Sequence, residues 1–493
     1  MTEIVVGIKH IRDGVERLPI IESDMSVVGV IGTAPGADAD VFPLNTPVYV
    51  QSDDTALLAD LGATGSILEA IEGVQAQLLQ GGAKLVIVRV EAGVSTAATI
   101  TNVVGSSISK TGVWAFTKAP QALGLTPRIL LATGWTSQQV DGVKTLTIGT
   151  AGTGYEVGDT IAGTGGGGTG FAGEVTSVSE AGAITGVAIT NPGSGYTSAP
   201  TLTVTSDDGE NAVITATVGK LANAVCAALP PVAARLYAHA IVQGPTSSYQ
   251  AWKDWVETLQ SDRLIPGSTN DVIVLVNGAP VTRSACAYIA GLLVRRDTQF
   301  DGRPFHSAAN QPVYGIVGVS RDVEFSLTDA SVEAQDVFSR FGGVIVKGET
   351  GVESALSEGG FVYWGTDTLA SDSRWRFYNV TRGRDFIELA QIRTLREYLG
   401  KYNITFSTID AIVNTLDGQL SFLAATGDII DYRLGFEPGK NPGSEIRQGN
   451  LWIKFRAEEP PVLRKITISS QRYLESLDAM VVTIANQIDA LTI

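Results

Sequence analysis

Apolar and polar positions alternate along the first part of the chain in a way that predicts an α/β layer. Residues 27–32 and 84–90 are apolar runs of strand length, the first ending in a Gly/Pro turn, and 42–50 has the composition of a further strand. Residues 66–78 place apolar side chains three or four positions apart, which predicts a helix with one buried side. Strands and helices in this alternation are typical of an α/β domain.

The same alternation stops near Trp135 and resumes after Gly219. Beyond that point strands are expected at 237–242, 271–276 and 312–319, with helices between them. We therefore expect one α/β domain that is interrupted by an insertion, rather than two domains in succession.

The interruption, residues 139–219, contains an internal repeat. The motif Gly-Thr-Gly-Tyr at 152–155 recurs 41 residues later as Gly-Ser-Gly-Tyr at 193–196. Runs in which Thr alternates with Val or Ile predict strands, so we expect a compact all-β insert whose two ends lie close together. A disordered low-complexity linker is the alternative. The insert holds eight acidic residues and one lysine, a net charge of −7.

The pattern changes again after residue 370, to that of an α+β domain. The last residues are mixed, and 481–485 could be the end of a helix or a strand. Residues 1–25 alternate like strands but hold too few large apolar side chains to form a core, so they are expected to pack on another structure. The C-terminal elements expected are a strand and then a helix within 373–403, a second helix at 407–427, and strands at 427–437, 451–459 and 462–470.

Composition and charge exclude several classes of protein. The 493 residues carry a net charge of −16, which disfavours binding to a phosphate backbone, and no apolar run approaches the roughly 18 residues of a membrane span. The first residues lack the basic start and apolar core of a signal peptide. Cys226 and Cys286 stand apart in apolar stretches, which indicates reduced core residues and a reducing cytoplasm.

No constellation for catalysis or cofactor binding is found. Gly163, Gly165 and Gly168 match the dinucleotide fingerprint, but no helix is expected after them, and the match is attributed to chance. The histidines lack the spacing of a zinc site, and no serine lies in a nucleophile elbow. We expect no enzyme activity, no metal and no cofactor. The three histidines, His10, His239 and His306, are interpreted as structural.

Four arginines interleaved with aromatic residues form a denser signal. One interpretation is that they lie on the solvent-exposed face of a strand and pair with Asp372 and Asp385. The other is that they form a contact with another protein, because arginine and aromatic residues are enriched at the centres of interfaces. A nucleic-acid surface would need a net basic territory, and residues 370–493 are neutral. The four are Arg374, Arg376, Arg382 and Arg384.

Several stretches together are similar to the tail sheath protein of contractile phage tails and phage-tail-like particles. They include a Gly-Thr-Ala-Pro turn followed by Phe-Pro-Leu-Asn-Thr-Pro, and Tyr-Trp-Gly-Thr-Asp-Thr-Leu before the arginine-rich segment. The resemblance covers nearly the whole chain except the insert. The matching stretches are 27–50, 61–71, 290–325, 361–387, 427–434 and 466–477.

The resemblance implies a structural protein that stacks as hexameric rings around a tail tube and contracts without nucleotide hydrolysis, driving the tube through the host envelope. Its partners would be copies of itself, the tail tube protein, and baseplate and tail terminator proteins, without nucleic acid or membrane insertion. The location implied is the virion tail, assembled in the host bacterial cytoplasm. A phage and a tail-like bacteriocin or injection machine are not distinguished.

The fold class implied is α/β and α+β multidomain. The expected parts are an N-terminal arm (1–25), a middle α/β sheath domain (26–138 with 220–365), an all-β insertion facing outward (139–219), a C-terminal α+β sheath domain (366–475) and a C-terminal arm (476–493).

In this family the two arms add strands to sheets in the C-terminal domains of neighbouring subunits. The family's tube contact corresponds to 408–425, which here has no Lys or Arg but holds Asp410 and Asp417, and Lys440 and Arg447 are the expected substitutes. The expected strand donors are Glu3, Ile4, Val5, Val6, Gly7 and Ile8 in the first arm, and Val481, Val482, Thr483, Ile484 and Ala485 in the second.

Two other functions stay open at this point. One is a structural protein that binds glycans or a host surface through the 139–219 repeat, with the α/β region as a scaffold. The other is an enzyme built on the α/β domain, which would demand a cluster of polar residues in a pocket.

Overall fold

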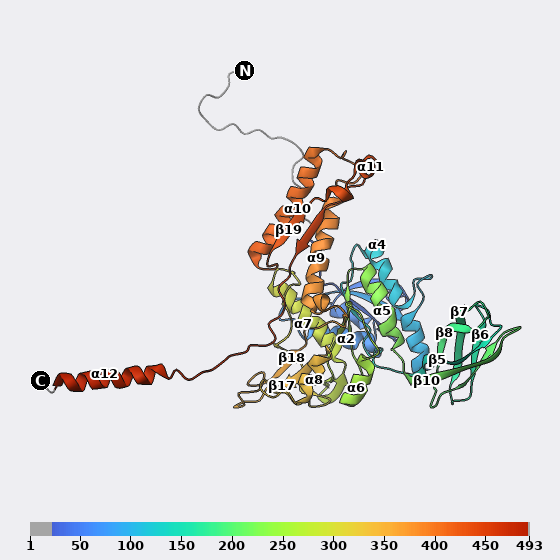
Figure 1. Ribbon diagram of the computed structural model, residues 1–493, viewed down its shortest axis with the longest axis horizontal. Coiled ribbons are helices and arrows are strands. Elements are labelled where there is room, and N and C mark those ends of the chain that lie inside the picture. The colour runs from blue at the N-terminus through green and yellow to red at the C-terminus, as the bar shows by residue number, and fades with distance from the viewer. Residues whose placement is uncertain (1–21, 492–493) are drawn as a thin grey trace, which may run out of the picture. The chain divides into compact units, whose positions relative to one another are not determined.

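The computed structural model describes residues 22–491 (Figure 1). A compact unit ends at Pro460, and residues 461–493 form a second unit. Residues 461–475, assigned from sequence to the C-terminal domain, therefore lie outside the compact unit. The expected strand donors at 3–8 and His10 lie outside the described residues.

A six-stranded sheet forms the centre of the middle domain. β1 pairs in parallel with β3 on one side and β4 on the other, and β11 lies parallel to β4 and β12. Only β2 is antiparallel. The order is β12 (Leu264–Pro266), β11 (His239–Val242), β4 (Ile129–Leu131), β1 (Val28–Thr33), β3 (Lys84–Val90) and β2 (Pro47–Gln51).

Both faces of this sheet are buried, so its strands are nearly continuous apolar runs. On one face Val28 and Val30 pack with α2 (Ser66–Gln75) and α7 (Ala285–Gln299). On the other, Ile31 packs with α5 and α6. The remaining helices before residue 370 are α1 (Thr55–Ala59), α3 (Thr96–Val104), η1 (Gly112–Lys118), α4 (Ala119–Leu123), α5 (Ala224–Arg235), α6 (Tyr249–Val256) and α8 (Glu333–Ser339).

Two small sheets extend the middle domain. β13 (Val272–Val276) lies between β14 (Ala279–Arg283) and β16 (Gly318–Val319), and β18 (Phe361–Trp364) lies between β15 (Gln311–Pro312) and β17 (Val344–Lys347). Both sheets are antiparallel throughout.

The segment between β4 and α5 folds as strands around a core of its own, and Figure 1 shows them as a separate group. β5 pairs with β10 from Asp141 opposite Lys220, so the segment leaves and re-enters the host domain at adjacent positions. The second sheet has the order β8-β7-β6-β9. Their bounds are β5 (Asp141–Thr153), β6 (Thr160–Thr164), β7 (Thr169–Val178), β8 (Ile184–Ser194), β9 (Thr201–Thr205) and β10 (Glu210–Lys220).

The repeat is visible in these strands. Thr160 opens β6 and Thr201 opens β9, the same offset of 41 residues that separates the buried Tyr155 and Tyr196. The first strand of each repeat pairs with the third strand of the other, β5 with β10 and β8 with β7. The two repeats thus share their strands, and the segment is ordered strand structure rather than a linker.

The C-terminal part of the compact unit is a helical hairpin packed on a short sheet. α9 (Tyr378–Leu395) and α10 (Phe406–Thr426) lie side by side, and Gln419 donates a hydrogen bond to the Ile387 carbonyl between them. Beside them β19 (Tyr432–Gly435) pairs with β20 (Lys454–Ala457). η2 (Ser373–Trp375), η3 (Pro438–Lys440) and α11 (Gly443–Arg447) complete this part.

Three sequence expectations differ from the structure here. Residues 373–395 form η2 and α9, not a strand and then a helix, because Asp372 caps a 3-10 turn by accepting from the Arg374 N–H. Residues 462–470 form no strand within this chain. Residues 481–485 lie in α12 (Glu475–Leu491) and not in a strand. None of the described helices combines the length and apolar character that a membrane span requires.

Candidate assembly interface

The motifs tested for chemistry have structural explanations. Gly163 lies in β6, and the chain after it turns into β7, so no helix follows the glycine fingerprint. Among residues 22–491 no three His, Cys, Asp or Glu side chains gather as a metal site. Cys226 and Cys286 are free and buried, and burial raises the pKa of both thiols. His306 stacks on Phe300 with ring centroids 3.4 Å apart.

The carboxyl edge of the parallel strands, where open α/β sheets bind ligands, is filled by side chains. Ser66, at the start of α2, accepts hydrogen bonds from the Thr33 N–H at 3.2 Å and from the Trp135 indole at 3.1 Å. Beside them, the Trp255 indole donates to the Thr136 carbonyl at 2.9 Å. These groups satisfy one another at the position that a ligand would take.

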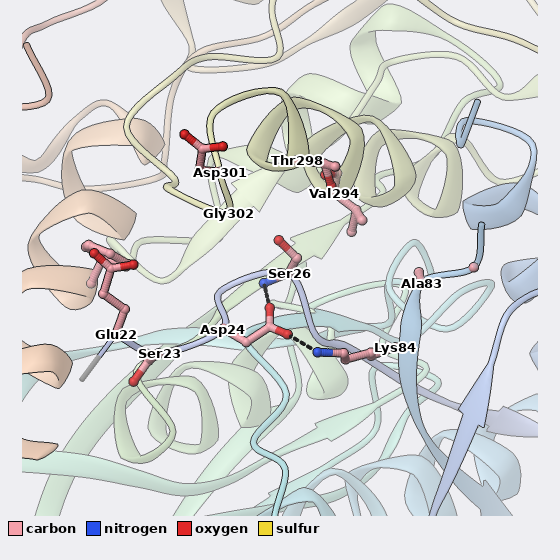
Figure 2. A pocket seen from close by; sticks show the side chains of 12 residues that line it. Glu22, Ser23, Asp24, Ser26, Ala83, Lys84, Val294, Thr298, Asp301 and Gly302 are labelled. Atoms are coloured by element: carbon pink, nitrogen blue, oxygen red, sulfur yellow. Dashed lines mark hydrogen bonds and ion pairs between the residues drawn. The ribbon is translucent and has the colours of Figure 1, made fainter. Parts of the chain in front are cut away.

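A cavity of about 460 Å³ opens where the described chain begins, at Glu22 (Figure 2). The Asp24 carboxylate, which lines this cavity, accepts hydrogen bonds from the Ser26 N–H at 3.0 Å and from Lys84 at 2.8 Å. Asp301 stands apart across the cavity in Figure 2. Among the described residues that line it there is neither His nor Cys.

Arg382 is fully buried and ties three segments together. Its guanidinium donates to Asp297 on α7, with one contact at 3.1 Å, and to the Met25 carbonyl at 3.2 Å. Burial raises the pKa of Asp297, and the contact with Arg382 opposes that rise. Arg382 is therefore a structural residue and does not form a surface contact.

The other three arginines are also paired inside the chain. Arg384 donates to Glu459 at 2.7 Å and packs over the Trp375 ring. Arg376 donates to Asp367 at 2.8 Å. Arg374 pairs with Asp372 as expected, but Asp385 pairs with Arg263. Arg374 alone of the four has a mostly exposed side chain, at 82%. The side chains of the other three are largely covered by the segments that carry their carboxylate partners.

The expected tube-contact residues lie on α10 and in the loop between β19 and β20. Asp410 and Asp417 are exposed on α10, where Asp410 accepts from Asn414 at 3.0 Å and Asp417 accepts from the Tyr432 hydroxyl at 2.8 Å. Lys440 sits 5.6 Å from the centre of the Trp452 ring, and Arg447 ends α11.

The two-stranded sheet of β19 and β20 has no third strand among the described residues. Its four residue pairs run from Tyr432 opposite Ala457 to Gly435 opposite Lys454. Two-stranded ribbons are marginally stable alone, and open strand edges are templates for pairing with another chain. Both edges of this short sheet are therefore open among the described residues.

The second unit contains exposed apolar side chains in a stretch without regular secondary structure. Residues 461–473 contain no helix or strand, and the side chains of Leu463, Ile466 and Ile468 are exposed. In α12 the apolar residues recur every three or four positions, the period of a helix, which explains why 481–485 are helical. Alternation over only five residues could not separate the two possibilities.

Comparison with known proteins agrees with the resemblance expected from the sequence. No family model matches the sequence. A putative prophage major tail sheath protein of Pseudomonas aeruginosa (strain UCBPP-PA14) is 26% identical over 262 residues, covering 52% of this chain and 64% of that protein. The tail sheath protein of Escherichia phage P2 is 22% identical over 491 residues, 98% of each chain. This chain is similar to contractile tail sheath proteins.

Solved structures share the sheath fold over almost the whole chain. The contracted helical sheath of the anti-feeding prophage covers 96% of this chain at 14% identity, with a TM-score of 0.56. The contracted sheath complex of the PVC extracellular contractile injection system covers 97% at 12% identity, also with a TM-score of 0.56. The expected resemblance to tail sheath proteins and the mixed α/β fold are thus confirmed.

Sequence reasoning missed the buried pairs and the open sheet. Asp297 follows two arginines at the end of an apolar helix, where burial is expected. A charged residue at such a position could have indicated a partner of opposite charge inside the chain. The strands at β19 and β20 were expected, but the sequence carried no sign that they pair only with each other.

Proposed function

We propose that this chain is the sheath subunit of a contractile phage tail or a related particle. It stacks as hexameric rings around the tail tube and shortens without nucleotide hydrolysis, which drives the tube through the host envelope. Its partners are other copies of itself, the tail tube, the baseplate and the terminator, and its location is the virion tail. The end-to-end relationship to the phage P2 tail sheath protein carries this proposal.

Neighbouring subunits are held together by donated strands. The open edges of β19 and β20 support an acceptor in the C-terminal domain. As donors we propose residues 3–8 and, in place of the helical 481–485, residues 462–470, where Ile466 and Ile468 alternate with polar residues and are exposed. A strand of this length adds about four to six ladder hydrogen bonds of about 0.5–1.5 kcal/mol each.

Contraction needs no nucleotide if the short state buries more surface than the long one. A difference of a few hundred Å² per subunit corresponds to several kcal/mol at about 25 cal/mol per Å². Summed over the copies in a tail, this is sufficient to do mechanical work. The filled carboxyl edge of the parallel sheet supports a mechanism without a bound nucleotide.

Electron microscopy of the overexpressed full chain tests the sheath function. We expect ribbed tubular polymers in negative stain, and dispersed globular particles would overturn the proposal.

A proline scan tests strand donation by the tail. Thr467→Pro removes an N–H from the proposed donor strand and should abolish the polymers, because proline cannot complete a ladder. Gln471→Pro, four residues further on in the same stretch without helix or strand, is the matched control and should polymerise normally. Normal polymers with both variants would exclude 462–470 as the donor.

A further inference from the structure

The sheet of β19 and β20 places one arginine directly opposite another. Arg433 and Arg456 are partners in its register, so their side chains leave the sheet on the same face, and both are exposed. Within residues 22–491, no carboxylate forms an ion pair with either guanidinium. Like charges directly opposite each other destabilise a strand pair. An acidic group from another chain would relieve this repulsion.

The other face of the sheet is apolar and packs on the α9–α10 hairpin. Before β20 the same alternation continues, because Leu451 and Ile453 are half-buried and Trp452 is exposed. Asn441 binds the Trp452 N–H at 2.7 Å and its carbonyl at 2.9 Å, which holds this stretch in place. The face that packs on the hairpin consists of Tyr432, Leu434, Phe455 and Ala457.

The free edge of β19 is poorly suited to an acidic strand. A cavity of about 650 Å³ opens between α10 and β19, and Asp417 and Asp431 line it together with Arg433. These two carboxylates would repel an acidic side chain brought to that edge. The edge of β20 is therefore the better acceptor for an acidic strand.

The outward residues along β20 include one arginine without an ion pair. Lys454 is engaged by Glu437 at 2.8 Å, and the Glu437 carboxylate also attracts Arg456, more weakly. Among the described residues of this edge, Arg456 is thus the cation that no carboxylate contacts. A guanidinium of this kind can bind a carboxylate through two parallel hydrogen bonds.

Residues 3–8 have a pattern that matches both faces of this edge. In the proposed function, on which this step rests, the segment adds a strand to the C-terminal domain of a neighbour. When its more apolar side faces the hairpin, its single acidic residue faces the arginines. The side toward the hairpin consists of Ile4, Val6 and Ile8, and the outward side of Glu3, Val5 and Gly7.

Apolar alternation alone leaves the register of such a strand undecided. A slip of one residue turns every apolar side chain to the solvent, whereas a slip of two residues keeps both faces as they were. A carboxylate that must reach one particular guanidinium distinguishes these registers, because the charged hydrogen bonds form in only one of them.

The direction of the strand follows from what lies on either side of Arg456. With Glu3 opposite Arg456, an antiparallel strand continues along residues 451–455, where the alternation of buried and exposed side chains persists. A parallel strand would instead reach Pro460, which has no N–H to complete a ladder. The antiparallel direction is therefore favoured.

We propose that residues 3–8 of a second copy of this chain pair antiparallel with β20, with Glu3 opposite Arg456. The Glu3 carboxylate then lies on the two opposed arginines of the sheet and relieves their repulsion. In this register Val5 is opposite Lys454. The arginine pair thus sets the register in which a neighbouring subunit is joined.

Charge exchange in the full chain tests this pairing. Glu3→Arg and Arg456→Glu should each lower the yield of sedimentable polymer by about tenfold. The two changes together should restore it to within about twofold, because every copy both donates and accepts a strand. Arg235→Glu, at an exposed arginine in the last turn of α5, is the matched control and should polymerise normally. Normal polymers from both single variants, or a double variant no better than either, overturn the pairing.

Disulfide formation between two different copies tests the register. One copy carries Val5→Cys, and the other carries Lys454→Cys or, to detect a slip of two residues, Trp452→Cys. A disulfide needs Cβ atoms about 3.5–4.5 Å apart, which directly opposite positions provide. Mixed polymers should join 5 to 454 at least about tenfold more than 5 to 452. Cys226 and Cys286 are free but buried and should not react.

The possible failures of this test are distinguishable. In samples that form normal polymers, equal disulfide yields at 452 and 454 overturn the proposed register, and no disulfide at either position overturns the pairing with β20. Both results leave the sheath function standing. Absence of polymers from the unmodified chain would overturn the sheath function, and the strand pairing with it.

Discussion

Arg382 shows how single residues hold the C-terminal part to the middle domain. Its contacts reach α7 through Asp297 and the start of the chain's described part through the Met25 carbonyl. A buried charge that loses its partner costs much more than an exposed one, because the remaining charge is left without solvent.

Arg382→Met should therefore lower the free energy of unfolding by about 3–5 kcal/mol. Urea unfolding of the unpolymerised chain measures this change. Arg374→Met, at a solvent-exposed pair, is the control and should leave the free energy of unfolding nearly unchanged. Adding Asp297→Leu to Arg382→Met should recover part of the loss, and a double variant no better than the single one would contradict the ion-pair explanation.

His239 makes stability depend on pH. It is buried in β11, its Nδ1 lies 3.7 Å from a carboxylate that Arg263 already engages, and burial together with Arg263 and Arg382 lowers its pKa well below the ordinary 6.5. The unfolded chain takes up a proton below pH 6.5 and the folded chain does not. The contribution of His239 to the free energy of unfolding is therefore fully present above pH 6.5 and decreases as the pH falls below it.

Between pH 7.5 and 5.5 the wild-type chain should lose about 1.4 kcal/mol through His239 alone. Unfolding of His239→Leu measured across the same range should show a shallower slope, whatever its absolute stability. Parallel pH profiles for the two proteins would show that the imidazole does not contribute.

At the scale of elements, the period of the apolar residues decided what the sequence could predict. The long runs at β1 and β3 and the spaced residues of α2 indicated buried strands and a helix correctly. Short or charged segments were ambiguous. The stretch before α9 was expected to be a strand, but it forms a capped 3-10 turn that leads into α9, where Arg382 is buried.

The candidate interface could be predicted only in part, because pairing between strands is set by the whole fold. The sequence indicated strands for β19, β20 and 462–470, but not that, among the described residues, the first two pair only with each other while the third forms no strand. Likewise the four clustered arginines suggested a surface, whereas three of them pair with buried carboxylates inside the chain, and Asp297 and Glu459 come from distant segments.

Tyr196→Ala should unfold the insert without disturbing the host sheet. The ring is 2% exposed in the insert's own core, and removing a large aromatic side chain from a core costs about 3–5 kcal/mol. Limited proteolysis should then cut between residues 141 and 220 while the rest of the chain resists. Cleavage spread over the central sheet as well would show that the two cores fold together.

At the scale of the whole molecule, the chain combines a host fold with a removable part. Gln139 donates to the Leu221 carbonyl, and the Leu221 N–H donates to the Val140 carbonyl at 3.0 Å, so the two ends of the insert meet. The insert carries −7 of the total charge of −16. We propose that this segment faces outward in the assembly, because like charges on neighbouring copies repel one another.

Replacing residues 140–219 by a short Gly-Ser turn should leave polymer formation intact. Negative-stain images of the deleted and full-length chains measure this, and the deleted polymer should be thinner if the insert faces outward. Only unassembled protein from the deletion would show that the insert takes part in packing. Binding of glycans or host surface by the full-length chain and not by the deleted one would favour the alternative function.

The shared strands of the two repeats determine how the insert responds to cleavage by a protease. The loop between β7 and β8 joins the repeats, yet β7 also pairs with β8 and β5 with β10 across the two halves. A protease that cuts this loop would divide the polypeptide without separating its pieces. The nicked chain should migrate as one species under native conditions and as two fragments only after denaturation.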